Sequence, residues 1–106
     1  MNDLILILTT MPDDDRARAL ARTLVDEGLA ACVNVQAPMT SIYRWKGEVE
    51  EEAERQLVIK TARKRLPDVE ARLRTLHPYD LPELIVLNAE AGAVYGAWVV
   101  DVSRPV

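Results

Sequence analysis

The chain has 106 residues, enough for one domain and too few for two ordinary ones. Its composition, 49% hydrophobic and 28% charged, is typical of a globular protein and not of a disordered one. A net charge of −4 and a pI of about 5.0 argue against a broad surface for nucleic acid or anionic membrane. We therefore expect a single domain over residues 1–106, with no nucleic-acid partner and no membrane partner.

Two features indicate a cytoplasmic location. The only cysteine, Cys32, cannot form an intrachain disulfide, suits a reducing compartment, and is most simply a small buried hydrophobe. Near the N-terminus, residues 4–8 form a short apolar run after an aspartate. That pattern is neither a cleavable signal sequence nor a membrane span.

The first part of the chain predicts a buried strand followed by a helix. Residues 4–10, LILILTT, form a continuous apolar run bounded by polar residues. Pro12 and the three aspartates after it suit a helix start, where carboxylates meet the positive end of the helix dipole. Apolar residues then recur at helical spacing, at Ala17, Leu20, Ala21, Leu24 and Val25. Gly28 is the expected helix stop.

The middle of the chain predicts a long β-hairpin over residues 31–61. Within residues 32–35, two valines alternate with Cys and Asn, as on the two sides of a strand. The Lys46-Gly47 pair marks the turn, with aromatic and aliphatic residues before it and QLVIKT after it.

A second helix, a last strand and a C-terminal element complete the pattern. Residues 66–77 predict a helix that ends before Pro78, because the residue before a proline disfavours the α conformation. The apolar face of this helix consists of Val69, Leu73 and Leu76. Residues 83–88, ELIVLN, predict a strand that begins at Glu83. Residues 91–102 predict a small-residue helix or an irregular tail that packs Val94 and Trp98.

The resulting order, β-α-β-β-α-β plus a C-terminal element, is the α+β, ferredoxin-like arrangement. Two helices on one face of the sheet leave the other face bare, and the hairpin strands are long for a compact domain. An exposed sheet face with long strands predicts an oligomer.

The only histidine, His77, lies in the segment LHPYDLPE at residues 76–83. At a helix end, an imidazole can interact with the last carbonyl groups, which is a purely structural role. It can also be one ligand of a Cu(II) or Zn(II) site that a carboxylate or a neighbouring subunit completes. The motif contains no second histidine, so both interpretations stay open.

Two sets of charged residues also have alternative interpretations. Three glutamates share one side of the predicted strand: Glu50, Glu52 and Glu54. They can attract hard cations weakly, but a solvated strand protected from aggregation explains them more simply. Lys60 and Glu83 can form a structural ion pair or an acid/base couple, and no nucleophile or phosphate-binding loop accompanies them.

Three stretches carry a resemblance to a known family: LAACVNV (29–35), SIYRWKGEVEE (41–51) and LHPYDLPELIVL (76–87). With TTMPD (9–13), in this order, the chain resembles the CutA family of divalent-cation tolerance proteins. The resemblance implies a ferredoxin-like subunit in a homotrimer similar to the PII signalling proteins. It also implies that hairpin strands pair between subunits, with Trp45 in the contact.

The resemblance transfers the family's metal ligands only in part. His77 matches the histidine of the HPY motif, and some relatives bind Cu(II). Those relatives have a cysteine where this chain has Thr9 and a second histidine where it has Leu76. A hydroxyl and an alkyl chain are not the soft ligands that copper prefers.

Together with this resemblance, which implies the trimer and the tolerance role, the sequence predicts a trimeric, non-enzymatic, cytoplasmic protein of divalent-ion (copper) tolerance. It would bind a divalent cation such as Cu or Zn, or a small ligand, near the subunit interfaces, with no organic cofactor. The residues that we place in this pocket are Tyr43, Trp45, Lys60, His77, Tyr79 and Glu83. The alternatives are a small-molecule-binding signalling or scaffold trimer with a protein partner, and an enzyme with an acid/base site between subunits.

Overall fold

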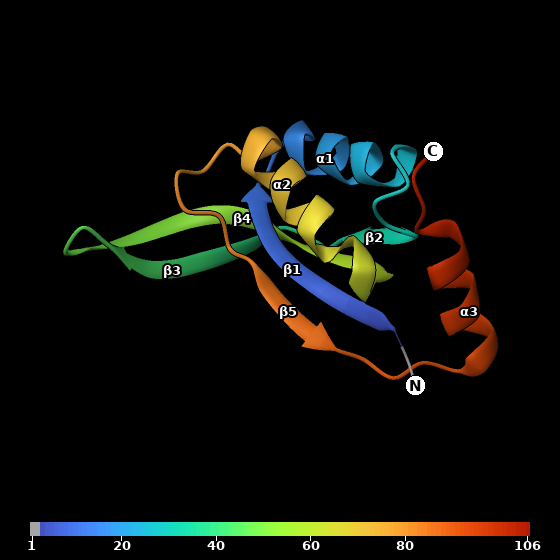
Figure 1. Ribbon diagram of the computed structural model, residues 1–106. Helices are drawn as coiled ribbons and strands as arrows, with labels where there is room; N and C mark the ends of the chain where they lie inside the picture. The colour runs from blue at the N-terminus through green and yellow to red at the C-terminus, as the bar shows by residue number, and fades with distance from the viewer. Residues whose placement is uncertain (1–2) are drawn as a thin grey trace.

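A nine-residue strand, β1 (Leu4–Pro12), lies inside a five-stranded antiparallel sheet in the computed structural model, which describes residues 3–106. The alternation of side chains along β1 defines the two faces of this sheet. Ile5 and Ile7 are fully buried on one face, whereas Leu6 and Leu8 remain partly exposed on the other. Helices cover the first face only (Figure 1), and the second is called the open face below.

The longest strand, β4 (Glu48–Ala62), pairs with every other strand of the sheet except the last one. It pairs with β1 along one edge, and along the other edge with β2 (Cys32–Val35) and β3 (Met39–Trp45). The last strand, β5 (Ile85–Asn88), pairs with the free side of β1. The β3–β4 hairpin extends beyond the helices as an arm (Figure 1), and the chain measures 44 Å along its longest axis.

The predicted hairpin is confirmed, with one difference in its first strand. Lys46 and Gly47 both have positive φ, 50° and 84°, as a two-residue turn between twisted strands requires. The segment before the turn is interrupted, however, because three residues, 36–38, oppose only two, 55–56. Pro38 lies in this interruption and has no N–H for the ladder.

Helix α1 (Asp15–Asp26) begins later than the sequence predicts. Pro12 is the last residue of β1, and the Asp14 carboxylate caps the helix by accepting the Arg16 N–H at 2.9 Å. The helix buries the predicted stripe except Val25, which is 42% exposed. Gly28 follows with a φ of 70°, and a Cβ at this position would overlap the carbonyl oxygen of Arg104.

Helix α2 (Leu66–Leu76) follows a 3-10 turn, η1 (Arg63–Arg65), and buries Val69 and Leu73. Leu76 was predicted on the same face, but it is 37% exposed, because the chain turns into an extended conformation at the next residue. The strand predicted from residue 83 begins only at Ile85, where pairing with β1 starts.

The C-terminal element is a helix, α3 (Ala93–Val102), at the end of the sheet away from the arm (Figure 1). The predicted packing of Val94 and Trp98 is wrong: they are 87% and 44% exposed. The two residues are four positions apart, so they share one helix face, and this face turns away from the rest of the chain. Val99 is the fully buried residue of this helix.

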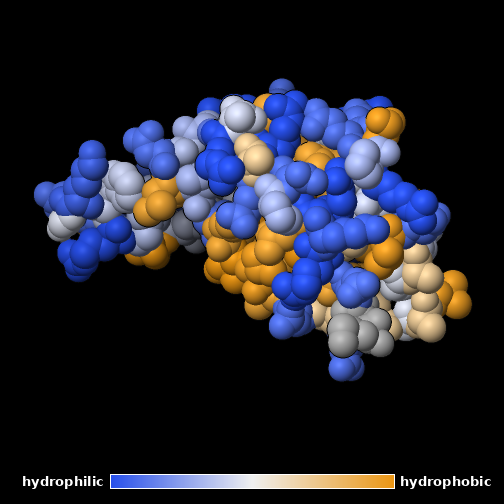
Figure 2. Space-filling model, in the orientation of Figure 1, coloured by the Kyte–Doolittle hydropathy of each residue, from blue (hydrophilic) through white to orange (hydrophobic). Residues whose placement is uncertain are grey.

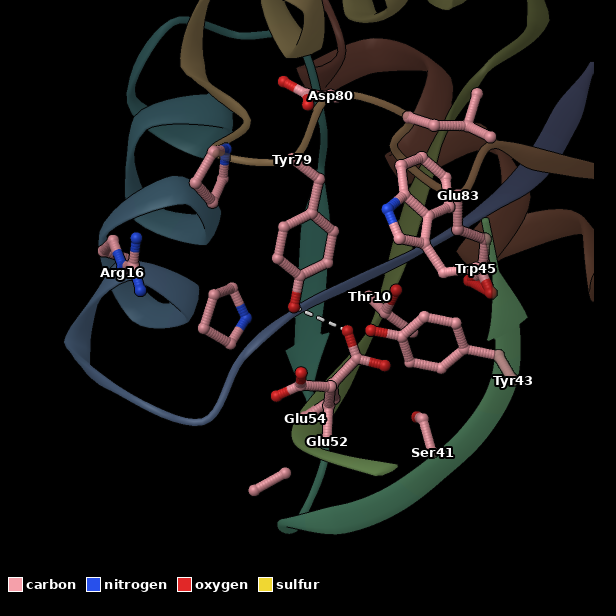
Figure 3. A pocket seen from close by; sticks show the side chains of 14 residues that line it. Thr10, Arg16, Ser41, Tyr43, Trp45, Glu52, Glu54, Tyr79, Asp80 and Glu83 are labelled. Atoms are coloured by element: carbon pink, nitrogen blue, oxygen red, sulfur yellow. Dashed lines mark hydrogen bonds between the residues drawn. The ribbon is translucent and has the colours of Figure 1, made fainter. Parts of the chain in front are cut away.

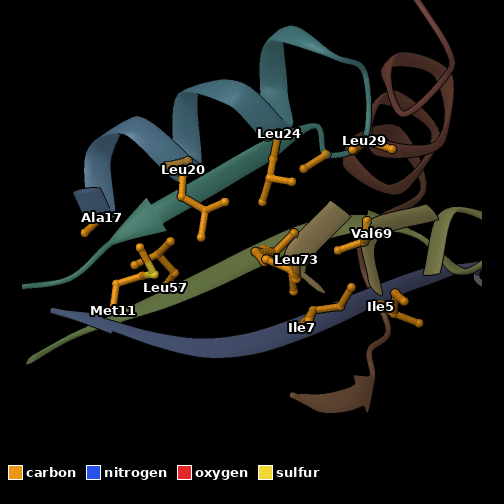
Figure 4. Packing of buried hydrophobic residues seen from close by; sticks show 13 residues of the cluster. Ile5, Ile7, Met11, Ala17, Leu20, Leu24, Leu29, Leu57, Val69 and Leu73 are labelled. Atoms are coloured by element: carbon orange, nitrogen blue, oxygen red, sulfur yellow. The ribbon is translucent and has the colours of Figure 1, made fainter. Parts of the chain in front are cut away.

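The hydrophobic core fills the space between the covered face of the sheet and helices α1 and α2 (Figure 4). Leu20 and Leu24 of α1 meet Leu57 and Ile59 of β4, among others. Apolar atoms also gather on the surface over β5 (Figure 2). Among residues 3–106, no helix has the length and apolar character that crossing a bilayer requires.

Candidate functional site

A cleft of about 700 Å³ lies on the open face, where the arm leaves the sheet (Figure 3). The end of β1, the arm strands β3 and β4, and the loop before β5 all line it. Tyr43 and Trp45 contribute aromatic rings from β3, and Glu52 and Glu54 contribute carboxylates from β4. The loop adds Tyr79 and two further carboxylates, those of Asp80 and Glu83.

Strand register explains why these side chains share one face. Directly paired residues of antiparallel strands point to the same side of a sheet. Tyr43 pairs with Glu50 and Ser41 with Glu52, so alternate residues of both arm strands face the cleft. Pro12 of β1 pairs with Glu54, which extends the same face into the body of the sheet.

The loop at residues 78–83 is fixed by the single histidine. The His77 Nε2 lies 2.8 Å from the carbonyl oxygen of Thr10, and the Tyr79 N–H donates to His77 Nδ1 at 3.2 Å. Since Nδ1 accepts a hydrogen bond, the proton of the neutral ring lies on Nε2, which donates to Thr10. Burial lowers the pKa of His77, against opposing effects of the Thr10 carbonyl and the Glu54 carboxylate.

A buried tyrosine–carboxylate pair forms the floor of the cleft. The Tyr79 hydroxyl donates to Glu54 Oε2 at 2.5 Å, and Glu54 is only 6% exposed (Figure 3). Burial raises the pKa of Tyr79, and the hydrogen bond to Glu54 raises it further. The pKa of Tyr43 is raised by loss of hydration and by the charges of neighbouring glutamates. Both phenols therefore act as neutral hydrogen-bond donors at pH 7.

Four of the six residues predicted for the pocket line this cleft: Tyr43, Trp45, Tyr79 and Glu83. His77 lies behind it and positions its loop. Lys60 lies elsewhere, with its Nζ 5.9 Å from the centroid of the Tyr95 ring, whereas Glu83 accepts a hydrogen bond from Gln56 at 2.8 Å. The structure therefore does not bring Lys60 and Glu83 together as an acid/base couple.

Within one chain, the side chains of residues 3–106 do not gather three or more ligands for a divalent metal ion. Within residues 3–106, no group of three or more His, Cys, Asp or Glu side chains could hold a metal ion. Both ring nitrogens of His77 are engaged, and Leu76 is partly exposed without polar atoms in its side chain. Thr9 is fully buried, and its Oγ1 has no hydrogen-bond partner in the described chain. A metal-binding role for His77 stays a prediction, and it requires the loss of one of these hydrogen bonds.

The sequence did not single out Glu54 as a buried residue. It was one of three glutamates on the same side of a predicted solvated strand. The structure instead buries Glu54 under Tyr79, 25 residues further along the chain. The sequence did contain a clue. Side chains at every second residue of two paired strands share one face of the sheet, so Glu54 could be placed on the same face as the aromatic residues of the partner strand.

The fold and the cleft define a small α+β protein whose solved neighbours include one described as PII-like. A sequence profile of the family described as CutA1 divalent ion tolerance protein matches residues 5–102. The chain therefore belongs to this family.

Similarity to individual proteins agrees with that membership. The chain is 45% identical to the divalent-cation tolerance protein CutA of Thermus thermophilus, over 88% of this chain and 91% of that protein. It is 41% identical to the human protein CutA over 92% of its length, but spans only 55% of the human protein. The structure of the PII-like protein CutA from Nostoc sp. PCC 7120 superposes with a TM-score of 0.89 at 35% identity, covering 96% and 99% of the two chains.

Proposed function

We propose that this chain forms a cytoplasmic homotrimer that acts in the tolerance of divalent metal ions, without catalysis. It does so by weak binding of a cation or a small ligand in the cleft, close to a subunit interface. The observation that carries this proposal is the accumulation of carboxylates in a cleft on the open face of a protein of this family. The printed names of its relatives support the physiological context.

Exposed apolar side chains support assembly. On β5 and the loop before it, Leu81, Ile85 and Leu87 are 72%, 46% and 44% exposed. On the arm, Ile42 and Val49 are 65% and 62% exposed. Several large apolar side chains left exposed in a single chain are typical of protein interfaces. Light scattering at micromolar concentration is expected to give three times the chain mass, and a monomer mass would contradict the trimer and the interfacial position of the cleft.

Calorimetric titration of Cu(II) and Zn(II) tests the metal part of the proposal. Wild type is expected to bind weakly. His77→Ala tests the predicted histidine ligand, and Glu54→Gln tests the cleft carboxylate in parallel. Identical titrations of wild type and His77→Ala would remove His77 from the ligand set. If neither Cu(II) nor Zn(II) binds to wild type, the proposal that the protein binds metal ions directly would be overturned.

A small-molecule signalling trimer is the second candidate, since aromatic rings contribute much of the cleft. Such a protein would respond to an organic ligand and would present its surface to a protein partner. A ligand that binds in the cleft while Cu(II) and Zn(II) do not bind would favour this candidate over direct metal binding.

A further inference from the structure

The geometry points to a specific class of ligand for the cleft: a small organic cation, of the alkylammonium type, with Glu54 as its charge partner. Tyr43 and Trp45 would form the aromatic walls around its alkyl groups. This inference rests on the proposed function, because it takes the cleft as the ligand site, and it names the chemistry that the site selects.

The first observation is a buried carboxylate without a cationic partner. Glu54 is 6% exposed, and within residues 3–106 it forms no ion pair and accepts one hydrogen bond, from Tyr79 to Oε2. No residue of the described chain donates a hydrogen bond to its second oxygen, Oε1, which keeps some contact with solvent. A largely buried carboxylate is unfavourable unless it is paired and hydrogen-bonded. An N–H of a bound ammonium would supply both the donor and the positive charge.

The charges around Glu54 also select for a cation. Three further carboxylates line the cleft, those of Glu52, Asp80 and Glu83. Arg16 is the one basic residue in this lining, and its guanidinium already donates three hydrogen bonds to the Asp14 carboxylate, at 2.8, 3.1 and 3.2 Å. The cleft therefore carries a negative field that attracts cations and repels anions.

The aromatic lining favours an organic cation over a bare metal ion. The carboxylates do not converge: in the described chain, no three acidic or metal-binding side chains are close enough to hold one ion. Tyr43 and Trp45 are 40% and 38% exposed in the single chain, and both line the cleft. Such rings attract ammonium groups, and the Lys46 ammonium already lies 5.7 Å from the centroid of the Trp45 ring. One carboxylate with aromatic walls suits an alkylammonium, whereas Mg²⁺, Ca²⁺ or Zn²⁺ needs several convergent ligands.

Calorimetric titration of the full-length chain with three probes of equal size tests the inference: butylammonium, butanol and butyrate. Butylammonium alone is expected to bind, because only it combines an alkyl chain with a positive charge. Glu54→Gln keeps an acceptor for the Tyr79 hydroxyl but removes the charge, and it should weaken binding at least tenfold. Glu51→Gln is the matched control, since this glutamate lies three positions away along β4, on the opposite face of the strand, and is exposed. It should leave the affinity unchanged.

Tyr43→Leu provides a second variant that does not touch the buried pair, and it should weaken binding severalfold while leaving the thermal unfolding midpoint near that of wild type. Equal binding of butylammonium and butanol, or equal affinity of wild type and Glu54→Gln, would overturn the inference and leave the cleft as a ligand site. Absence of butylammonium binding while Cu(II) or Zn(II) binds would overturn it and leave the proposed function intact. If butylammonium binds but neither Cu(II) nor Zn(II) does, the inference would stand and only the proposal of direct metal binding would be contradicted.

Discussion

The two faces of the sheet are built differently, although they belong to the same strands. On the covered face, Leu57 and Ile59 of β4 are fully buried under helices of the same chain. On the open face, the neighbouring Val58 and the strand β5 are only partly covered, and a charged residue, Glu54, is buried there instead (Figures 2 and 3). The covered face is complete within one chain. The open face has exposed apolar surface and a buried carboxylate with no ion-pair partner among residues 3–106, and so we expect recognition to occur there.

The largest expected difference in the free energy of unfolding is between leucine-to-alanine substitutions on the covered face and on the open face. Leu57→Ala leaves a cavity in the core and should lower the free energy of unfolding by about 2–5 kcal/mol. Leu87→Ala, at a residue that is 44% exposed on the open face, should lower it by no more than about 1 kcal/mol in the separated subunit. Urea unfolding at two protein concentrations measures both. Equal losses that do not depend on concentration would mean that the open face contributes as much as the core within one chain.

Trp45 tests whether the open face is an assembly surface. It is 38% exposed on the arm, and truncation of an aromatic residue in an interface typically costs about 2 kcal/mol or more of binding energy. Trp45→Ala should therefore shift the mass measured by light scattering toward the monomer and lower the unfolding midpoint. Trp98→Ala, at a similarly exposed aromatic residue on α3, shows whether the effect is specific to the arm. An unchanged mass and midpoint for Trp45→Ala would exclude it from the interface.

Two buried threonines show that even the covered face has a polar defect. Thr9 and Thr61 are both fully buried, but only Thr61 has a partner: its Oγ1 donates to the Leu29 carbonyl at 2.6 Å. Valine has nearly the same shape as threonine and no hydroxyl. Thr9→Val should raise the free energy of unfolding by about 1 kcal/mol, whereas Thr61→Val should lower it by about 1 kcal/mol or more.

The opposite signs are the essential result, and urea unfolding of both variants at the same protein concentration provides the measurement. A loss of stability in Thr9→Val would instead contradict the absence of a hydrogen-bond partner for its hydroxyl in the described chain.

The covered face could be predicted from the sequence, since its residues follow helix and strand periodicity. The helical stripe from Ala17 to Leu24 and the continuous run in β1 indicate which side chains are buried. The hairpin turn was equally clear, because Lys46-Gly47 suits a two-residue turn that needs positive φ. These features depend on neighbours within a few residues.

The open face could be predicted only in part. Four of the predicted pocket residues line the cleft, whereas Lys60 lies outside it in the single chain, and the burial of Glu54 was not predicted. Both depend on contacts between distant segments: the loop carrying Tyr79 closes over Glu54, and Lys60, six positions further along β4, lies next to Tyr95 of α3. For α3, Val94 and Trp98 were assigned to a core within the chain although they are exposed. An apolar pattern alone does not tell a core within one chain from a surface that awaits a partner.

His77 links the two environments and gives the smallest expected effect. Its ring is hydrogen-bonded to the backbone of β1. Burial is the main effect on its pKa and lowers it, whereas the charge of Glu54 acts to raise it. The folded chain then binds a proton less readily than the unfolded chain, so the histidine favours the folded state fully above about pH 6.5. As the pH falls from there toward the lower pKa of the folded state, the free energy of unfolding should decrease. His77→Gln should remove this part of the pH dependence, while carboxylates that titrate at lower pH affect both proteins alike. Urea unfolding between about pH 5 and 7.5 measures the difference. If wild type gained stability on acidification relative to His77→Gln, the charge of Glu54 would outweigh burial, and the floor of the cleft would already have a cationic partner in His77.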